Sequence, residues 1–140
     1  MKRIINFVLM FVLLLVTCTG CSKTAATQDL WESAVYTENT EFGTGEKTLS
    51  VTVSAEEKSV TFTVHSDKKT VGEALQEHNL IDGEKGPYGL YVKSVNGIIA
   101  DYDVDQSYWA FTKAGESLQT GVDGEEFSDG DSYELSRVEN

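Results

Sequence analysis

Three aspartates at alternate positions, Asp101, Asp103 and Asp105, are the group of side chains whose spacing points most directly to chemistry. Carboxylate oxygens suit Ca²⁺, and the spacing matches the first three ligands of an EF-hand loop. A true EF-hand is excluded, because Gln106 replaces the required Gly and Thr112 replaces the bidentate Glu. Other acidic residues could complete a different site: Asp123, Glu125, Glu126, Asp129 and Asp131. A specific cation site and a solvated acidic loop both remain open.

Two adjacent aromatic residues, Tyr108 and Trp109, offer a second kind of chemistry. An exposed aromatic ring can stack on a planar ligand or a sugar. Neighbours in a strand point to opposite faces, so we expect one ring in the core and the other nearer the surface. A purely structural role, as a core aromatic beside an edge aromatic, is the alternative.

The sequence offers no recognisable catalytic group. It contains no Gly-x-Ser-x-Gly motif, no phosphate-binding loop and no pair of histidines at metal-ligand spacing. His65 and His78 stand alone, and a lone histidine is more often packed or solvated than catalytic. We therefore expect a protein that binds a ligand and is not an enzyme.

A hairpin and a helix are the first elements expected to position these residues. Alternating apolar and polar residues over 49–53 and 60–64 predict two paired strands with one buried face. Thr70 and Glu73 have the spacing of a capping box, and Asn79 can adopt the left-handed conformation that ends a helix. The pattern predicts a single helix of about ten residues between them.

Several further strands follow the helix. A loop is expected at 82–87, and strand-like segments occupy 90–95, 108–111 and 132–138. Asn96-Gly97 is a strong hairpin-turn signal, because both residues tolerate a positive φ. This order indicates an α+β fold of the β-grasp type, in which one helix crosses a mixed sheet.

The amino-terminal segment resembles a bacterial lipoprotein signal peptide. Lys2 and Arg3 precede the largely apolar run Ile4–Val16, which is too short to span a membrane but long enough for a signal peptide. Gly20 before Cys21 matches the point at which such signals are cleaved and the Cys is acylated. We expect Cys21 to carry a lipid and to anchor the exported protein to the outer face of a bacterial cell membrane.

This signal divides the chain into three parts. Residues 1–20 would form the signal peptide, 21–29 a flexible tether of small polar residues, and 30–140 the folded domain. The departure from the lipoprotein pattern is Cys18, where Leu is usual. The alternative is a plain secreted protein in which Cys18 and Cys21 form a disulfide.

The charge balance excludes nucleic acid as a partner. The 140 residues contain 23 Asp and Glu against 11 Lys and Arg, a net charge of −12. Loss of residues 1–20 would leave 9 basic against 23 acidic groups, a net charge of −14. Such a chain is repelled by phosphate backbones, whereas its 40% hydrophobic residues suffice for the core of one domain.

Five short motifs follow one another along residues 46–138, and they are Val71-Gly-Glu-Ala-Leu75, Gly86-Pro-Tyr-Gly-Leu-Tyr-Val-Lys-Ser-Val-Asn-Gly97, Tyr108-Trp109, Gly121-Val122 and Asp129-Gly-Asp131. This series resembles the transcobalamin-like C-terminal domain family of bacterial surface lipoproteins. The resemblance implies a β-grasp ligand-binding fold, because the related domain of the vertebrate vitamin B12 carriers covers one side of a corrinoid. The positions that would approach a ligand are Pro87, Tyr88, Val95, Asn96, Gly97, Tyr108 and Trp109.

One departure from those carriers limits the expected function. Their second, helical domain completes the site and supplies the group that ligates cobalt, and 140 residues leave no room for it. The first expectation is a surface ligand-binding lipoprotein for a corrinoid or another small ligand, alone or with a partner surface protein. The alternative is a Ca²⁺-binding interaction or adhesion module that docks a protein or a cell-wall glycan.

Overall fold

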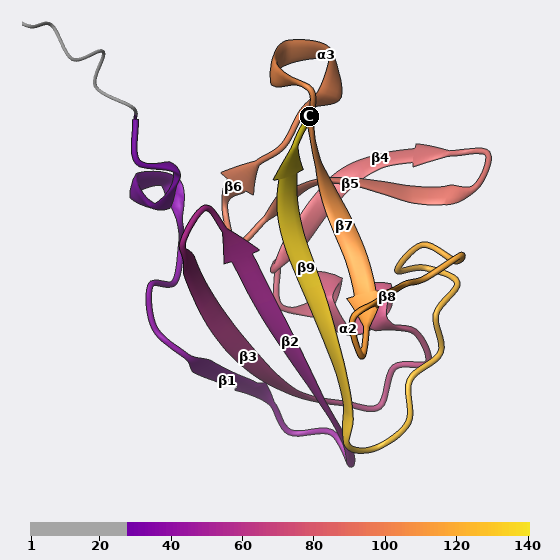
Figure 1. Cartoon of the computed structure of the whole chain (residues 1–140). Helices are drawn as coiled ribbons and strands as arrows, with labels where there is room; N and C mark the ends of the chain where they lie inside the picture. Colours follow the sequence, from indigo (N-terminus) through magenta and orange to yellow (C-terminus); the bar gives the residue numbers. More distant parts are fainter. Residues whose placement is uncertain (1–27) are drawn as a thin grey trace, which may run out of the picture.

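The computed structural model describes residues 28–140, so the predicted cleavage site and Cys21 lie outside the described residues. Within 28–140, no helix is both long enough and apolar enough to cross a bilayer. The chain is built mainly of strands, which form one large and one small sheet (Figure 1).

The large sheet has six strands in the order β1-β3-β2-β9-β7-β8. It is mixed, because β1 runs parallel to β3 and β2 runs parallel to β9, whereas its other pairs are antiparallel. Its strands are β1 (Thr40–Gly43), β2 (Lys47–Ala55), β3 (Lys58–Ser66), β7 (Ser107–Lys113), β8 (Glu116–Ser117) and β9 (Asp131–Glu139).

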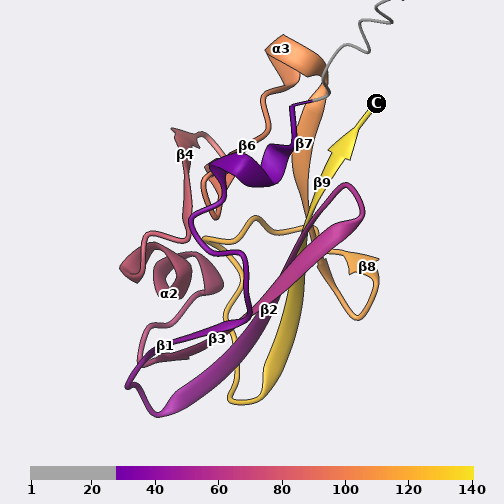
Figure 2. The same cartoon turned by 90° about the vertical axis from the view of Figure 1, so that its left-hand side faces the viewer.

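The small sheet is an antiparallel array of β4 (Ile81–Gly86), β5 (Gly89–Val95) and β6 (Ile98–Ile99). It lies on the same side of the large sheet as helix α2 (Val71–Glu77) (Figure 2). A one-turn helix, α3 (Tyr102–Asp105), joins β6 to β7, and a short 3-10 helix, η2 (Leu30–Ser33), precedes β1. The predicted mixed sheet is therefore confirmed, whereas the single helix expected is accompanied by two short ones and by a second sheet.

Alternation along β2 explains how the large sheet separates core from solvent. Leu49, Val51 and Val53 are almost completely buried, whereas Ser50 and Thr52 between them are partly exposed. Side chains at alternate positions of a strand share one face, so the apolar face of β2 packs inward against α2 and the small sheet. The opposite face carries mainly hydroxyl side chains.

Local sequence sets both ends of α2. The Thr70 hydroxyl accepts from the Glu73 amide at 3.2 Å, and the Glu73 carboxylate accepts from the Thr70 amide at 3.2 Å, which is the predicted capping box. The amides of Thr70 and Lys69 both donate to the Glu73 carboxylate and lower its pKa. Asn79 has a φ of 56°, and the amide of Leu80 donates to the Leu75 carbonyl, which closes the carboxyl end.

An amino-terminal arm, residues 29–36, is fastened over the β5–β6 turn. The Trp31 indole donates to the Ala55 carbonyl at 3.0 Å. Asn96 accepts from the Tyr36 amide at 2.9 Å and donates to the Tyr36 carbonyl at 2.8 Å. A buried amide side chain bound at both ends fixes the arm more specifically than apolar packing alone.

Three elements differ from the sequence-based expectation. The expected loop at 82–87 is largely strand β4. It forms a strand because it pairs with β5, and its own sequence lacks the apolar–polar alternation that would have predicted this. Residues 102–105 form helix α3 instead of an open loop. Helix α2 has seven residues, fewer than the roughly ten expected, because His78 is already its C-cap and precedes the left-handed Asn79.

Gly97 provides a test of how strongly the arm is held. Its φ is +80°, and an added Cβ would lie 2.5 Å from the Ser33 carbonyl oxygen. Gly115 has the same φ of +80° in a similar turn, with no atom within 4 Å of such a Cβ. We expect Gly115→Ala to cost about 1 kcal/mol from the left-handed backbone, and Gly97→Ala to cost about 1–3 kcal/mol more from the clash.

Thermal unfolding of both variants measures this difference in stability. The expected result is a melting temperature several degrees lower for Gly97→Ala than for Gly115→Ala. Equal melting temperatures would show that the arm moves away from the new side chain without lowering the stability of the fold.

Candidate binding surface

The residues expected to contact a ligand fall on three different parts of the fold. Tyr88 is 98% exposed, and with Pro87 it forms the tip of the β4–β5 hairpin. Val95 and Asn96 are buried beneath the arm, where Asn96 already has its hydrogen-bond partners. Gly97 lies against the Ser33 carbonyl, so the arm covers this turn as well.

Tyr108 and Trp109 separate as strand alternation predicts. Trp109 is buried on the core side of β7, and no hydrogen-bond partner for its indole nitrogen is found within residues 28–140. Tyr108 is half-buried on the opposite face of the sheet, beside Val138 of β9. The structure therefore does not bring the hairpin tip, the Asn96 turn and Tyr108 onto one surface.

The β4–β5 hairpin projects beyond the large sheet, and a loop from near the carboxyl end supports it (Figure 1). Asp123 of that loop accepts from the Leu90 amide at 3.1 Å. The same loop caps α2, since the Val122 and Glu125 carbonyls accept from the first amides of the helix at 2.9 Å. The hairpin is thus anchored at Leu90, close to its tip, while the Tyr88 side chain stays in solvent.

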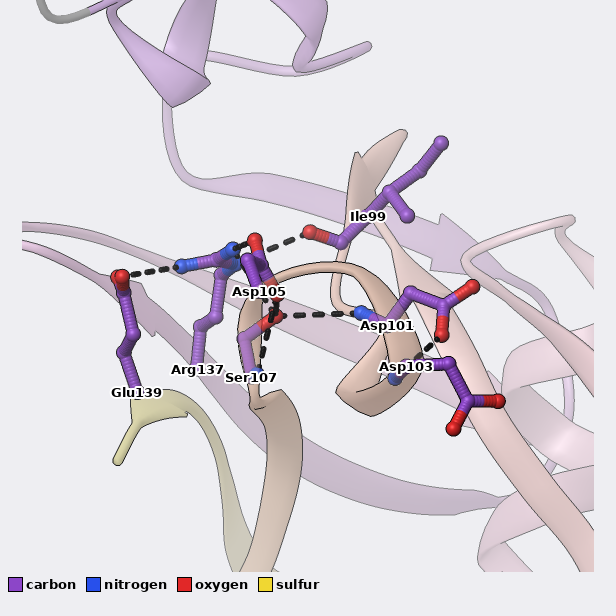
Figure 3. Close-up of polar contacts among 7 residues, drawn as sticks. All are labelled: Ile99, Asp101, Asp103, Asp105, Ser107, Arg137 and Glu139. Atoms are coloured by element: carbon purple, nitrogen blue, oxygen red, sulfur yellow. Dashed lines mark hydrogen bonds and ion pairs between the residues drawn. The ribbon is translucent and has the colours of Figure 1, made fainter.

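The Asp101–Asp105 turn is organised around Arg137 (Figure 3). The Arg137 side chain, only 6% exposed, donates to Asp105 at 2.6 Å, to the Ser107 hydroxyl at 3.0 Å and to the Ile99 carbonyl at 3.0 Å. The Ser107 hydroxyl also donates to Asp105. Hydrogen bonds from Ser107 and the neighbouring Arg137 guanidinium lower the pKa of Asp105.

The other two aspartates of the turn face elsewhere. Asp101 caps α3 by accepting from the Asp103 amide at 3.0 Å, and the Asp103 carboxylate points away from Arg137 (Figure 3). The ammonium of Lys93 lies 3.3 Å from Glu84 and 3.7 Å from Asp101, and these carboxylates raise the pKa of Lys93.

Positively charged side chains therefore lie beside two of the predicted metal ligands: Arg137 beside Asp105, and Lys93 beside Asp101. Within residues 28–140, no group of three or more His, Cys, Asp or Glu side chains is arranged to hold a metal ion. Asp101, Asp103 and Asp105 are not gathered as one ligand set, because the helical turn directs them apart. Ca²⁺ binding by these residues stays a prediction.

Exposed apolar side chains gather in one stretch of the described chain. Large hydrophobic residues with high exposure are Tyr88, Tyr91, Ile99, Tyr102 and Val104, together with Val35 of the arm. All except Val35 belong to the small sheet, its hairpin turn or α3. This segment is therefore the candidate region for contact with a ligand or a partner. The periodicity of the sequence could not reveal which of these side chains are exposed, because residues 88–104 show no simple alternation of apolar and polar residues.

Another hollow lies at the edge of the large sheet, away from these exposed side chains. It has a volume of about 480 Å³ and is lined by Gly43, His65, Glu77 and His78 with neighbouring polar residues. His65 is already bonded to Thr48 and Glu41, at 2.9 and 2.6 Å. The sequence drew attention to both histidines but not to their shared hollow, because β3 and α2 meet there only in the tertiary structure.

The pH dependence of stability should reveal the Asp105–Arg137 contact. A carboxyl group whose pKa is lowered by folding stabilises the protein above its unfolded-state pKa, and this contribution is lost as the pH falls through the folded-state pKa. We expect Asp105→Asn to be less stable than wild type near neutral pH and equally stable at strongly acidic pH.

Denaturant unfolding at a series of pH values measures both curves. Asp103→Asn is the matched control, because this carboxylate lies on the same turn but points away from Arg137. A constant difference between wild type and Asp105→Asn down to pH 2 would contradict the assignment.

Comparison with solved structures identifies the fold. Haptocorrin in complex with Cbi superposes with a TM-score of 0.53 and 18% identity, over 70% of this chain and 27% of haptocorrin. At this identity the likeness shows a shared fold, and the chain spans about a quarter of haptocorrin's length. No curated protein matches the sequence.

Residues 68–135 match the model of a domain of unknown function (DUF4430). A crystal structure from Ruminococcus gnavus ATCC 29149, of a protein provisionally named a metal binding protein, matches with 41% identity and a TM-score of 0.65. That match covers 68% of this chain and 99% of the Ruminococcus protein. The chain therefore belongs to the same protein family as the Ruminococcus gnavus protein.

Proposed function

We propose that the protein is an exported, lipid-anchored ligand-binding protein that contacts its ligand with the β4–β5 hairpin. The observation that carries the proposal is the almost full exposure of Tyr88 at the tip of a hairpin that Asp123 anchors at Leu90. A tyrosine held in solvent by an ordered support offers flat apolar area and a hydroxyl at little entropic cost to binding. Tyr91 extends this aromatic surface along β5.

The shared fold with haptocorrin favours a corrinoid or a similarly flat small molecule as the ligand. Haptocorrin was crystallised with Cbi, and the matched region is about a quarter of that protein. In this chain, Asn96 and Trp109 are buried, so the hairpin would contact one side of a ligand and leave the other side open. Binding by this chain alone should be weak, and a partner surface protein would strengthen it by covering the open side.

Titration with cobinamide tests this proposal. The full chain in neutral detergent should change the visible spectrum of cobinamide, and Tyr88→Ser should weaken binding about fivefold to tenfold, as expected for one stacking contact. Val35→Ser is the control, because it removes an exposed apolar side chain that belongs to the arm and not to the hairpin. A similar loss with both variants, or no response up to high micromolar cobinamide, would count against the hairpin as a corrinoid site.

Lipid anchoring is tested separately at Cys21, which precedes the described residues. The Cys21→Ser variant should appear in the soluble fraction, whereas the wild type should stay with the membrane and incorporate labelled fatty acid, because the buried acyl chains supply the membrane affinity. Retention of the variant in the membrane fraction, with no label in the wild type, would refute the anchor and leave the hairpin proposal untouched.

A further inference from the structure

Ile99 separates two hollows on the surface of the described domain. One, of about 280 Å³, is lined by residues of the small sheet: Asp82, Gly83, Glu84, Lys93, Ser94 and Ile99. The other, of about 220 Å³, is lined by the arm and again by Ile99, and includes Asp29, Leu30 and Glu32. The small sheet and the arm therefore border one surface region, and the Ile99 side chain lies between its two hollows.

The apolar content of this region is high for a solvent-facing surface. Ile99 is 64% exposed, and on the neighbouring helix α3 Val104 is 81% exposed and Tyr102 is also exposed. Arg137 binds both the Ile99 carbonyl and Asp105 of α3, so strand β6 and the helix lie next to each other (Figure 3). We call Ile99 and the residues lining the two hollows the Ile99 surface.

The Ile99 surface is held rigidly before any partner arrives. The buried Arg137 side chain joins β6, β7 and α3, and the Trp31 indole fastens the arm to the Ala55 carbonyl. Fixed apolar side chains bind at a lower entropic cost than mobile ones. This preorganisation distinguishes the surface from exposed apolar residues on a loose loop.

The rim of the Ile99 surface is acidic. Four carboxylates line the two hollows, from Asp29, Glu32, Asp82 and Glu84. Lys58 pairs with Asp29 at 2.6 Å and Lys93 with Glu84 at 3.3 Å, so two ammonium groups stand against the four carboxylates and the rim keeps a net negative charge. An apolar centre with this rim complements a partner that presents apolar side chains between basic ones, and it repels anionic lipid and a second copy of itself.

We propose that the Ile99 surface docks a protein segment in which an apolar side chain is flanked by Lys or Arg. The apolar side chain enters a hollow beside Ile99, and the basic groups meet the carboxylates of the rim. The proposal goes beyond ligand binding by the hairpin, since it uses other residues and needs no small molecule.

Labelled peptides of equal length provide the test, with the full chain held in zwitterionic nanodiscs and empty nanodiscs as the blank. The peptides alternate Leu with Lys, Leu with Glu, or Ser with Lys, and fluorescence anisotropy measures binding. The Leu/Lys peptide should bind best, and Ile99→Ser should weaken it about tenfold, or ~1.4 kcal/mol. Asp82→Asn should weaken it less, and by an amount that shrinks as salt rises.

Tyr88→Ser is the matched control, because it removes an exposed side chain from the hairpin tip and should leave peptide binding unchanged. Ile99→Ser should in turn leave the cobinamide response unchanged, which separates failure of this proposal from failure of ligand binding by the hairpin. Equal binding of the Ser/Lys peptide, equal binding of the Leu/Glu peptide, or full affinity of folded Ile99→Ser would overturn the docking surface. Ile99-dependent self-association in sedimentation, or Ile99-dependent binding to anionic vesicles, would also overturn it in favour of those occupants.

Discussion

The parallel pairing of β2 with β9 is the contact on which the rest of the structure depends. It places Val51 opposite Tyr133 and Val53 opposite Leu135, and so joins the amino-terminal hairpin to the carboxyl-terminal strand. Both edges of β2 are paired, which satisfies its backbone groups while its inward side chains are almost completely buried. Closing so long a loop costs entropy, and the buried apolar face must offset that cost.

Once β9 is in place, it positions the parts of the molecule that we propose as binding surfaces. The segment before β9 carries Val122 and Glu125 to the start of α2, and it carries Asp123 to the β4–β5 hairpin. Arg137 near the end of β9 holds α3 against β6. Strand β9 and the segment before it thus support both the β4–β5 hairpin and the Ile99 surface.

The acidic turn Asp101–Asp105 has the spacing of metal ligands, but in this structure two of its three aspartates stabilise the fold. Its Asp105 is neutralised by Arg137, Asp101 caps the helix and lies near Lys93, and Asp103 faces away. A protein guanidinium satisfies a carboxylate with directional hydrogen bonds and without the geometry that an ion demands. The consequence is a fixed α3 that displays Tyr102 and Val104 to solvent.

The sequence by itself determined the elements that depend on neighbours in the chain. Alternation along β2 and β3, the capping box of α2, and the turns at Asn96-Gly97 and Ala114-Gly115 all follow from local chemistry, and the positive φ angles at those turns match it. Only the tertiary structure decided that Asp82–Gly86 pairs as a strand, that the arm buries Asn96, and that Arg137 binds Asp105. These contacts depend on a second segment of the chain, and the residue pattern of one segment does not reveal which other segment it will pack against.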